Sequence, residues 1–178
     1  MASFSDAHEC DEIPIIAANM HRMILPRQSQ IWAVVKAGQP LQKLYYQICS
    51  GLLGRLCFSG EPDALSAAQW TVMDEGTAFY GKAASIIDHG VSRRLGSRIV
   101  SYRAPRGWQA VVRRGETQTL VVVHTFGAAP EAVTLPVGGK ITAQLMRDGL
   151  TVTHPDGQLT VHGFTDFDAA AFILENEG

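Results

Sequence analysis

The sequence predicts an α/β half followed by an all-β half that forms an antiparallel sandwich. Up to about residue 90, short continuous apolar runs alternate with runs of helical periodicity, as expected for buried strands between helices. From about residue 97, short alternating runs are separated by turn residues every 8 to 12 positions or so, which favours a sandwich or barrel. We therefore expect a tail over residues 1–12, an α/β part over 13–92 and a sandwich over 97–178.

In the α/β part, the apolar runs at residues 13–18 and 55–58 are expected to be buried strands. Residues 28–35 between them are expected to form a short helix. A longer helix should begin with Pro40 at its first position, which tolerates proline, and end near Gly54.

The helix that follows the second strand has clear N-terminal capping signals. Ser66 and Gln69 have the spacing of a capping box, and Leu65 and Trp70 flank them at the positions of a hydrophobic staple. Its apolar positions, from Leu65 to Ile86, continue at helical spacing to a stop at Gly90.

The sandwich is expected to contain eight strands joined by tight turns. Each turn contains glycine, which tolerates the positive φ of short hairpins, for example at Asp148-Gly149 and Asp156-Gly157. The expected strands are residues 99–103, 108–113, 119–126, 132–137, 141–147, 150–153, 159–162 and 170–174.

Composition excludes several classes of function. A net charge of -2 gives no support for a nucleic acid or an anionic membrane as partner. Cys10, Cys49 and Cys57 have neither a disulfide pattern nor the spacing of a zinc site, and we expect no metal and no cofactor. The acidic first twelve residues differ from a secretory signal, so a cytoplasmic location is expected.

The α/β part is too small to stand as a parallel sheet of its own. A buried parallel strand needs a neighbour on each side and helices on both faces, which two strands cannot supply. The sandwich can fold as an independent domain, whereas the α/β part is expected to be the C-terminal end of a larger α/β domain.

Several segments, in this order, resemble the closing section of glycoside hydrolase family 36, the α-galactosidase-like retaining enzymes. The resemblance covers about residues 13–174 and implies that the two expected strands are the seventh and eighth of a (β/α)8 barrel, followed by a C-terminal sandwich. The missing strands would then lie upstream of Met1. The segments are 27–34, 53–61, 65–70 with Phe79-Tyr80, 101–103, 107–113 and 121–127.

Retaining hydrolysis needs two carboxyl groups that face each other across the sugar. In family 36 the nucleophile follows a Lys-aromatic-Asp pattern on the fourth barrel strand, and the acid/base is in a Ser-Asp-containing stretch after the sixth. Neither pattern is identified in the 178 residues, so the resemblance implies that the chain lacks both aspartates. We therefore expect no catalytic residue in this chain and no activity of the chain alone.

Four residues are expected at the rim of the sugar pocket, because barrel active sites form at the C-terminal ends of strands. Asn19 follows the first expected strand, and Ser59, Gly60 and Glu61 follow the second. A role for Glu61 in the loop or at the start of the next helix, and a loop role for Asn19, are alternatives.

The leading interpretation is the C-terminal part of an enzyme that acts on an α-linked galactoside or a related sugar. Two other classes of function are open: a stand-alone carbohydrate-binding or structural sandwich, and a subunit that completes the barrel of another chain. Assembly as a homo-oligomer or pairing with a missing N-terminal portion is also open.

Overall fold

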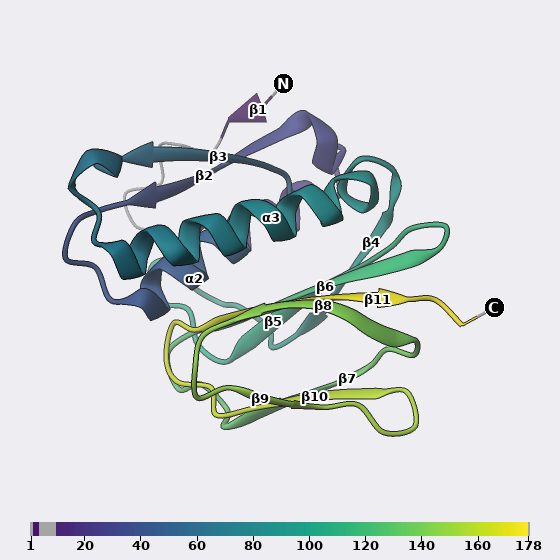
Figure 1. Ribbon diagram of the computed structural model, residues 1–178. Helices are drawn as coiled ribbons and strands as arrows, with labels where there is room; N and C mark the ends of the chain where they lie inside the picture. The colour runs from purple at the N-terminus through teal and green to yellow at the C-terminus, as the bar shows by residue number, and fades with distance from the viewer. Residues whose placement is uncertain (1, 4–9, 178) are drawn as a thin grey trace.

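The computed structural model describes residues 2–3 and 10–177, and these build four layers (Figure 1). A small parallel sheet lies on one side, and helices separate it from a five-stranded antiparallel sheet. A three-stranded antiparallel sheet covers the far side of the five-stranded sheet. The helical layer thus joins the α/β part to the sandwich.

The α/β part alternates helices with parallel strands. Strands β2 and β3 pair in parallel, and β1 pairs in parallel with the other edge of β2. The elements are β1 (Ala2–Ser3), α1 (Ile13–Met20), η1 (Pro26–Gln28), β2 (Ser29–Val35), α2 (Leu41–Gly51), β3 (Arg55–Gly60), η2 (Pro62–Ala64) and α3 (Ala67–His89).

Two of the predicted elements have the opposite structure. Residues 13–18, predicted as a strand, form helix α1, and residues 28–35, predicted as a helix, contain strand β2. An apolar run buried on nearly all sides looks the same in a short helix and in a covered strand, and α1 is such a run. In β2, burial alternates residue by residue, which is the pattern of a strand with one covered face.

The other elements of this half are confirmed. Helix α2 begins at Leu41, one residue after the predicted start, with Pro40 as its N-cap, and β3 includes the predicted strand at residues 55–58. At the start of α3, the Gln69 backbone N–H donates to Ser66 Oγ (3.3 Å) and the Ser66 N–H donates to Gln69 Oε1 (3.0 Å). The predicted capping box is therefore formed, and α3 ends before Gly90 as expected.

The all-β half forms two antiparallel sheets. Their orders are β4-β5-β6-β11-β8 and β7-β10-β9. The strands are β4 (Val91–Gly96), β5 (Trp108–Arg114), β6 (Gln118–Thr125), β7 (Ala132–Pro136), β8 (Lys140–Met146), β9 (Thr151–Thr153), β10 (Gln158–His162) and β11 (Ala169–Glu175).

Seven of the eight predicted strands are confirmed, and the first is wrong. Residues 99–103 lie in a loop in which Val100 is 87% exposed and Ser101 Oγ accepts from the Ala104 N–H. The first strand is instead β4, which pairs with β5 from Val91 opposite Arg114 to Gly96 opposite Gln109. Because β4 is an edge strand rich in polar residues, it lacks the apolar alternation that revealed the others.

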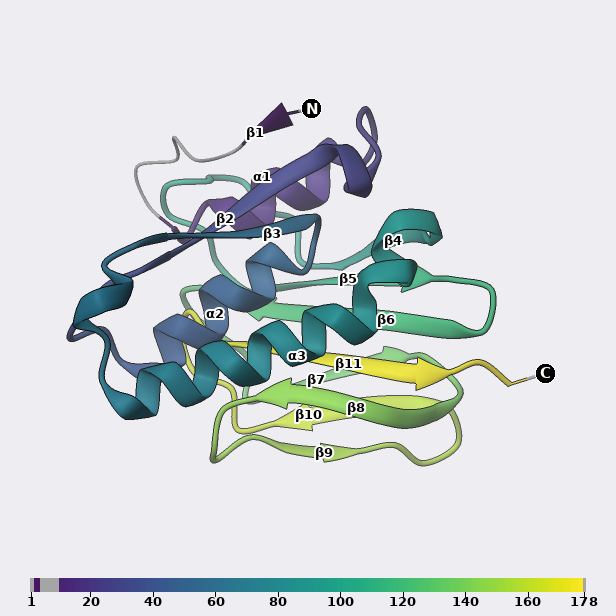
Figure 2. The ribbon, with the colours of Figure 1, turned by 45° about the horizontal axis from the view of Figure 1, so that its top comes forward.

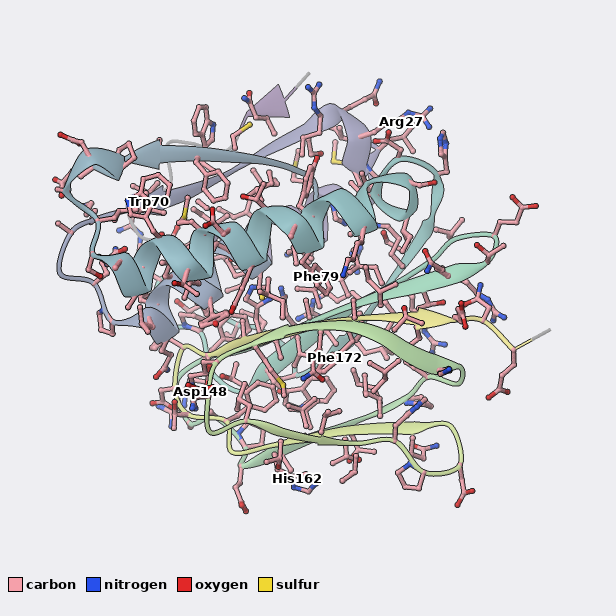
Figure 3. All side chains as sticks on the ribbon, viewed as in Figure 1. Arg27, Trp70, Phe79, Asp148, His162 and Phe172 are labelled. Carbon is pink, nitrogen blue, oxygen red and sulfur yellow. The ribbon has the colours of Figure 1, made fainter. Side chains whose placement is uncertain are left out.

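The five-stranded sheet is covered on both faces. Alternate residues of its strands point to opposite faces, so β6 sends Val122 toward the helices and Val121 toward the three-stranded sheet. Figure 3 shows Phe79 of α3 above the sheet and Phe172 of β11 between the two sheets. One apolar core therefore lies inside the sandwich, and a second is shared between the sheet and the helices.

Buried Arg113 of β5 ties the sheet to the end of α2. Its Nη2 donates to the Leu53 carbonyl (2.7 Å), Nη1 to the Leu52 carbonyl (3.4 Å) and Nε to Ser92 Oγ (2.9 Å). The guanidinium thus satisfies carbonyls that the helix end leaves without partners. Burial lowers the pKa of Arg113 to about 10.

A second junction joins α2 to β6 through a fully buried histidine. His124 Nε2 lies 3.2 Å from Ser50 Oγ, and the Tyr46 ring meets the imidazole edge to face at 5.0 Å. Burial lowers the pKa of His124 to about 3. The imidazole is therefore neutral in the folded protein at pH values where it is charged in the unfolded chain.

This difference predicts an acid-sensitive fold. Below pH 6.5 the unfolded chain binds a proton at His124 that the folded chain does not, so stability falls as the pH drops from 6.5 toward 3. The expected loss from His124 alone is about 2 kcal/mol at pH 5. Urea unfolding at pH 7 and pH 5 measures it. His124→Gln should remove the His124 part of the pH dependence and leave the part that comes from His21, whose pKa is also lowered. His89→Gln, at an exposed position, is the control and should not change the pH dependence. The same change of unfolding free energy with pH in all three proteins would contradict the prediction.

Candidate functional site

The C-terminal ends of β2 and β3 lie side by side. The parallel register runs from Gln30 opposite Arg55 to Val35 opposite Gly60, so the segments that follow the two strands leave the sheet at the same edge. Three of the predicted rim residues, Ser59, Gly60 and Glu61, lie at this edge. The structure thus brings these three together at the end of β3.

Gly60 and Glu61 are held against the end of β2. Gly60 has φ of +113°, and a Cβ there would lie 1.9 Å from the Val35 carbonyl oxygen, so only glycine fits. The Glu61 N–H donates to that carbonyl (2.9 Å). Its carboxylate Oε2 accepts from the Ala37 N–H (3.3 Å) in the loop after β2. Glu61 is therefore an exposed residue that braces two loops at this edge.

One face of the parallel sheet packs on the helices, and the opposite face is only half covered. Ile31 and Val35 of β2 belong to the core shared with the helices. The alternate residues, among them Gln30 and Ser59, are half-buried on the other face. There Gln30 Nε2 lies 3.0 Å from the Sγ of Cys57 on the neighbouring strand. Trp32 and Val34 of β2 lie on this face as well, so it carries both polar and apolar side chains.

Asn19 lies away from the other three rim residues. It is in the last turn of α1, where its Nδ2 donates to the Tyr102 hydroxyl (2.8 Å). Helix α1 runs antiparallel to β2 (Figure 2), so its end is near the beginning of the strand. The argument that placed Asn19 at a strand end is wrong, because residues 13–18 are helical.

The remaining pairs of carboxylates are engaged in the fold or exposed on a helix. Glu75 of α3 accepts from the Tyr45 hydroxyl (2.8 Å), and its neighbour Asp74 is exposed. Asp166 accepts from the Ala129 N–H (2.9 Å). Asp168 is fully buried and forms an ion pair with Arg147 (2.6 Å). No two of these four face each other across an open pocket.

Strand β1 adds a feature that the sequence reasoning missed. Ala2 and Ser3 pair in parallel with Ser29 and Gln30 of β2, at the edge opposite β3. Along the chain, Ser5-Asp6 follows this strand directly, although both residues lie outside the described part. The strand has only two residues and no apolar run, and the Ser-Asp pair after it is the one available signal.

In the described ranges 2–3 and 10–177, no three His, Cys, Asp or Glu side chains gather as metal ligands would. None of the helices described there is long and apolar enough to span a bilayer. Cys49 is buried, Cys10 and Cys57 are half-buried, and all three are free thiols.

Comparison with solved structures identifies the fold. The galactosidase domain of the α-galactosidase–sucrose kinase AgaSK matches 97% of this chain with a TM-score of 0.66 and 15% identity. The family 36 α-galactosidase AgaA from Geobacillus stearothermophilus, in its complex with raffinose, matches 97% with a TM-score of 0.65 and 11% identity. No family model and no curated protein sequence matches.

In both enzymes the match covers 25% of the longer chain, so this chain spans about a quarter of the length of its structural neighbours. An α-amylase from H. orenii also matches, over 96% of this chain and 48% of its own, with a TM-score of 0.53 and 11% identity. The fold is therefore that of the C-terminal region of family 36 α-galactosidases, and an α-amylase has a more distant version of it.

Proposed function

We propose that this chain is the C-terminal portion of a retaining α-galactosidase-like glycoside hydrolase of family 36. The observation that carries the proposal is the continuous match of helices, parallel strands and both antiparallel sheets to AgaSK and AgaA over 97% of the chain. The order of segments that resembles this family in the sequence supports it independently of the coordinates. A stand-alone sandwich module does not account for the parallel strands.

In this proposal, β2 and β3 are the seventh and eighth strands of a (β/α)8 barrel. They are parallel, and each is followed by a helix, α2 and α3, that packs on the same face, as barrel strands are. The half-covered opposite face then points to the barrel interior. Strand β1, parallel to β2 on its other side, takes the place of the sixth strand.

The strand order changes what we expect of the catalytic residues. If β1 is the sixth strand, Ser5-Asp6 has the position of the Ser-Asp stretch that contains the acid/base in family 36. We assign that role to Asp6. No Lys-aromatic-Asp sequence occurs in the chain, so the nucleophile is still missing, and the 178 residues alone are expected to be inactive.

The substrate of the complete enzyme is an oligosaccharide with a terminal α-linked galactose or a related sugar. AgaA was crystallised with raffinose and with stachyose, which supports this class. Ser59, Gly60 and Glu61 are the rim contacts, because they lie where the two parallel strands end. A cytoplasmic location fits the three free thiols.

The experiment begins with the DNA upstream of the codon for Met1. An open frame that encodes a Lys-aromatic-Asp sequence is expected, and the longer protein should hydrolyse p-nitrophenyl α-galactoside. Asp6→Asn should lower that rate by about 100-fold or more, because it removes a general acid. Asp63→Asn, at an exposed residue behind the end of β3, is the matched control and should change the rate little.

Three results would contradict the proposal. A 178-residue chain that hydrolyses the substrate, with a rate removed by Glu61→Gln, would place the catalysis elsewhere. A longer protein that is active on α-glucosides or starch and not on α-galactosides would favour the α-amylase relationship. A stop codon upstream, with a stable monomer that binds no galactoside, would favour a stand-alone module.

A further inference from the structure

A small cationic cavity lies between α1 and the edge of the five-stranded sheet, away from the end of β3. It has a volume of about 160 Å³, several times the ~30 Å³ that a water molecule occupies in the liquid. Such a space holds one small ion and no disaccharide. It is lined by Ala18, His21, Arg22, Ser92, Arg94 and Val111.

The charged side chains at this cavity all have the same sign. Arg22 comes from the segment after α1, Arg94 from β4, and buried Arg113 lies close enough to depress the pKa of His21. Arg22 likewise contributes to the lowered pKa of Arg94. Among the described residues no carboxylate lines the cavity. The group that would balance these cations is therefore not supplied by this part of the chain.

The cations are held in place by neutral groups. Arg94 donates from Nε to Gln109 Oε1 (3.3 Å) and from Nη2 to the Ser97 carbonyl (3.0 Å). Gln109 is itself fixed by donating to the Pro14 carbonyl of α1 (2.8 Å). Arg113 donates to Ser92 Oγ, so the Ser92 hydroxyl hydrogen is available to a further acceptor. Arg94 also keeps N–H groups that these bonds do not use.

His21 supplies the observation that points to a ligand. Both ring nitrogens are buried, and neither makes a hydrogen bond of good geometry, although the Leu53 backbone lies close enough to raise the pKa of the ring slightly. A buried polar atom without a partner costs free energy, and at the wall of a cavity a bound water or ion can supply the missing partner. Burial, and secondly the Arg113 charge, lower the pKa of His21 to about 4, so the ring is neutral near pH 7 in the absence of an anion.

We propose that His21, Arg22, Ser92 and Arg94 form a binding site for a tetrahedral oxyanion, either phosphate or sulfate, free or as a small monoester. Guanidinium groups bind such oxygens through charge-assisted hydrogen bonds, and the serine hydroxyl adds a neutral donor. The anion neutralises cations that no described carboxylate pairs. This inference does not depend on the proposed glycosidase function.

The test titrates sodium sulfate and inorganic phosphate into the purified chain at low ionic strength by calorimetry. Saturable binding of one anion per chain is expected. Arg22→Ala should weaken it about tenfold or more, because it removes a charge-assisted contact while the exposed residue leaves the fold intact. Arg93→Ala is the matched control, since the exposed Arg93 precedes Arg94 on β4 and points to the other face. Arg94→Ala, with its melting temperature measured, repeats the test at a second cation.

The pH dependence gives a separate readout. Arg22, Arg94 and Arg113 are the charged groups that face His21 from the elements around it. A bound anion offsets their field and raises the pKa of His21, so sulfate affinity should rise as the pH falls from 7 toward 5, and His21→Gln should remove this rise. Absence of saturable binding of both anions at millimolar concentration, or equal weakening by Arg22→Ala and Arg93→Ala, would overturn the proposal. A comparison of phosphate with a phosphate monoester distinguishes the two sources.

Discussion

Arg147→Met should lower the free energy of unfolding by about 3–5 kcal/mol, because it leaves a buried carboxylate without its counter-charge. Asp168 is fully buried, and its Oδ2 accepts from Arg147 Nε (2.9 Å) and Nη2 (2.6 Å). The carboxylate also accepts from the N–H groups of Thr165 (3.3 Å) and Ala169 (2.9 Å), which cannot neutralise its charge. The change therefore leaves the more deeply buried partner of the pair uncompensated.

Asp168→Asn should lower the free energy of unfolding by less than Arg147→Met does. In Asp168→Asn the remaining Arg147 side chain is 18% exposed and can turn toward water. The double variant should be more stable than Arg147→Met, and urea unfolding of all four proteins gives the coupling energy. Arg114→Met, at an exposed arginine of β5, is the control. A loss below about 1 kcal/mol for Arg147→Met would show that the pair behaves like a surface salt bridge.

This ion pair has a consequence for the α/β part. The segment before β11 is fixed by Asp168, and Gln42 at the start of α2 donates to Thr165 Oγ1 (3.0 Å) and to the Asp166 carbonyl (2.9 Å). The first turn of α2 is thus attached to the sheet. We expect Arg147→Met to loosen this attachment and also the beginning of β11, which follows Asp168 directly.

Local signals predicted the helices that have clear start signals and the strands that are bounded by turn residues. The capping box of Ser66 and Gln69 marked the start of α3, and apolar runs between turn residues marked seven strands of the sandwich. The same signals failed for α1 and β2, because the burial of α1 on nearly all sides comes from tertiary contacts. Strand β4 was missed because its neighbour β5, and not its own sequence, holds it in the sheet.

The candidate site was also predicted only in part. Ser59, Gly60 and Glu61 were placed at a strand end by a run of residues that does form a strand, and the structure has them there. The prediction for Asn19 was wrong because it assumed a strand over residues 13–18, which form helix α1. Asp6 was passed over, because β1 has two residues and no periodicity to reveal it. A short strand paired at the edge of a sheet is visible only once its partner β2 is known.

Residues 97–178, expressed alone, should fail to form a soluble folded domain, although the sequence marks them as a complete sandwich. In the structure one face of the five-stranded sheet is covered by helices, mainly α2 and α3, and Leu120, Val122 and Ile173 on that face are at most 1% exposed. Without the helices these side chains would form an exposed apolar surface, which drives aggregation. The segment would also lose edge strand β4 and the carbonyl partners of Arg113.

The measurement compares residues 97–178, residues 91–178 and the whole chain by solubility, size-exclusion chromatography and thermal unfolding. Restoring β4 in the 91–178 segment repairs the sheet edge and leaves the apolar face open, so both segments should aggregate while the whole chain unfolds in one cooperative transition. Limited proteolysis of the whole chain should then yield no stable product that begins near residue 97. The core between the helices and the sheet is expected to unfold in a single cooperative step, so the sandwich would not survive removal of the helices. A soluble 97–178 monomer with its own sharp transition would show instead that the sandwich folds independently and that the α/β part is only docked on it.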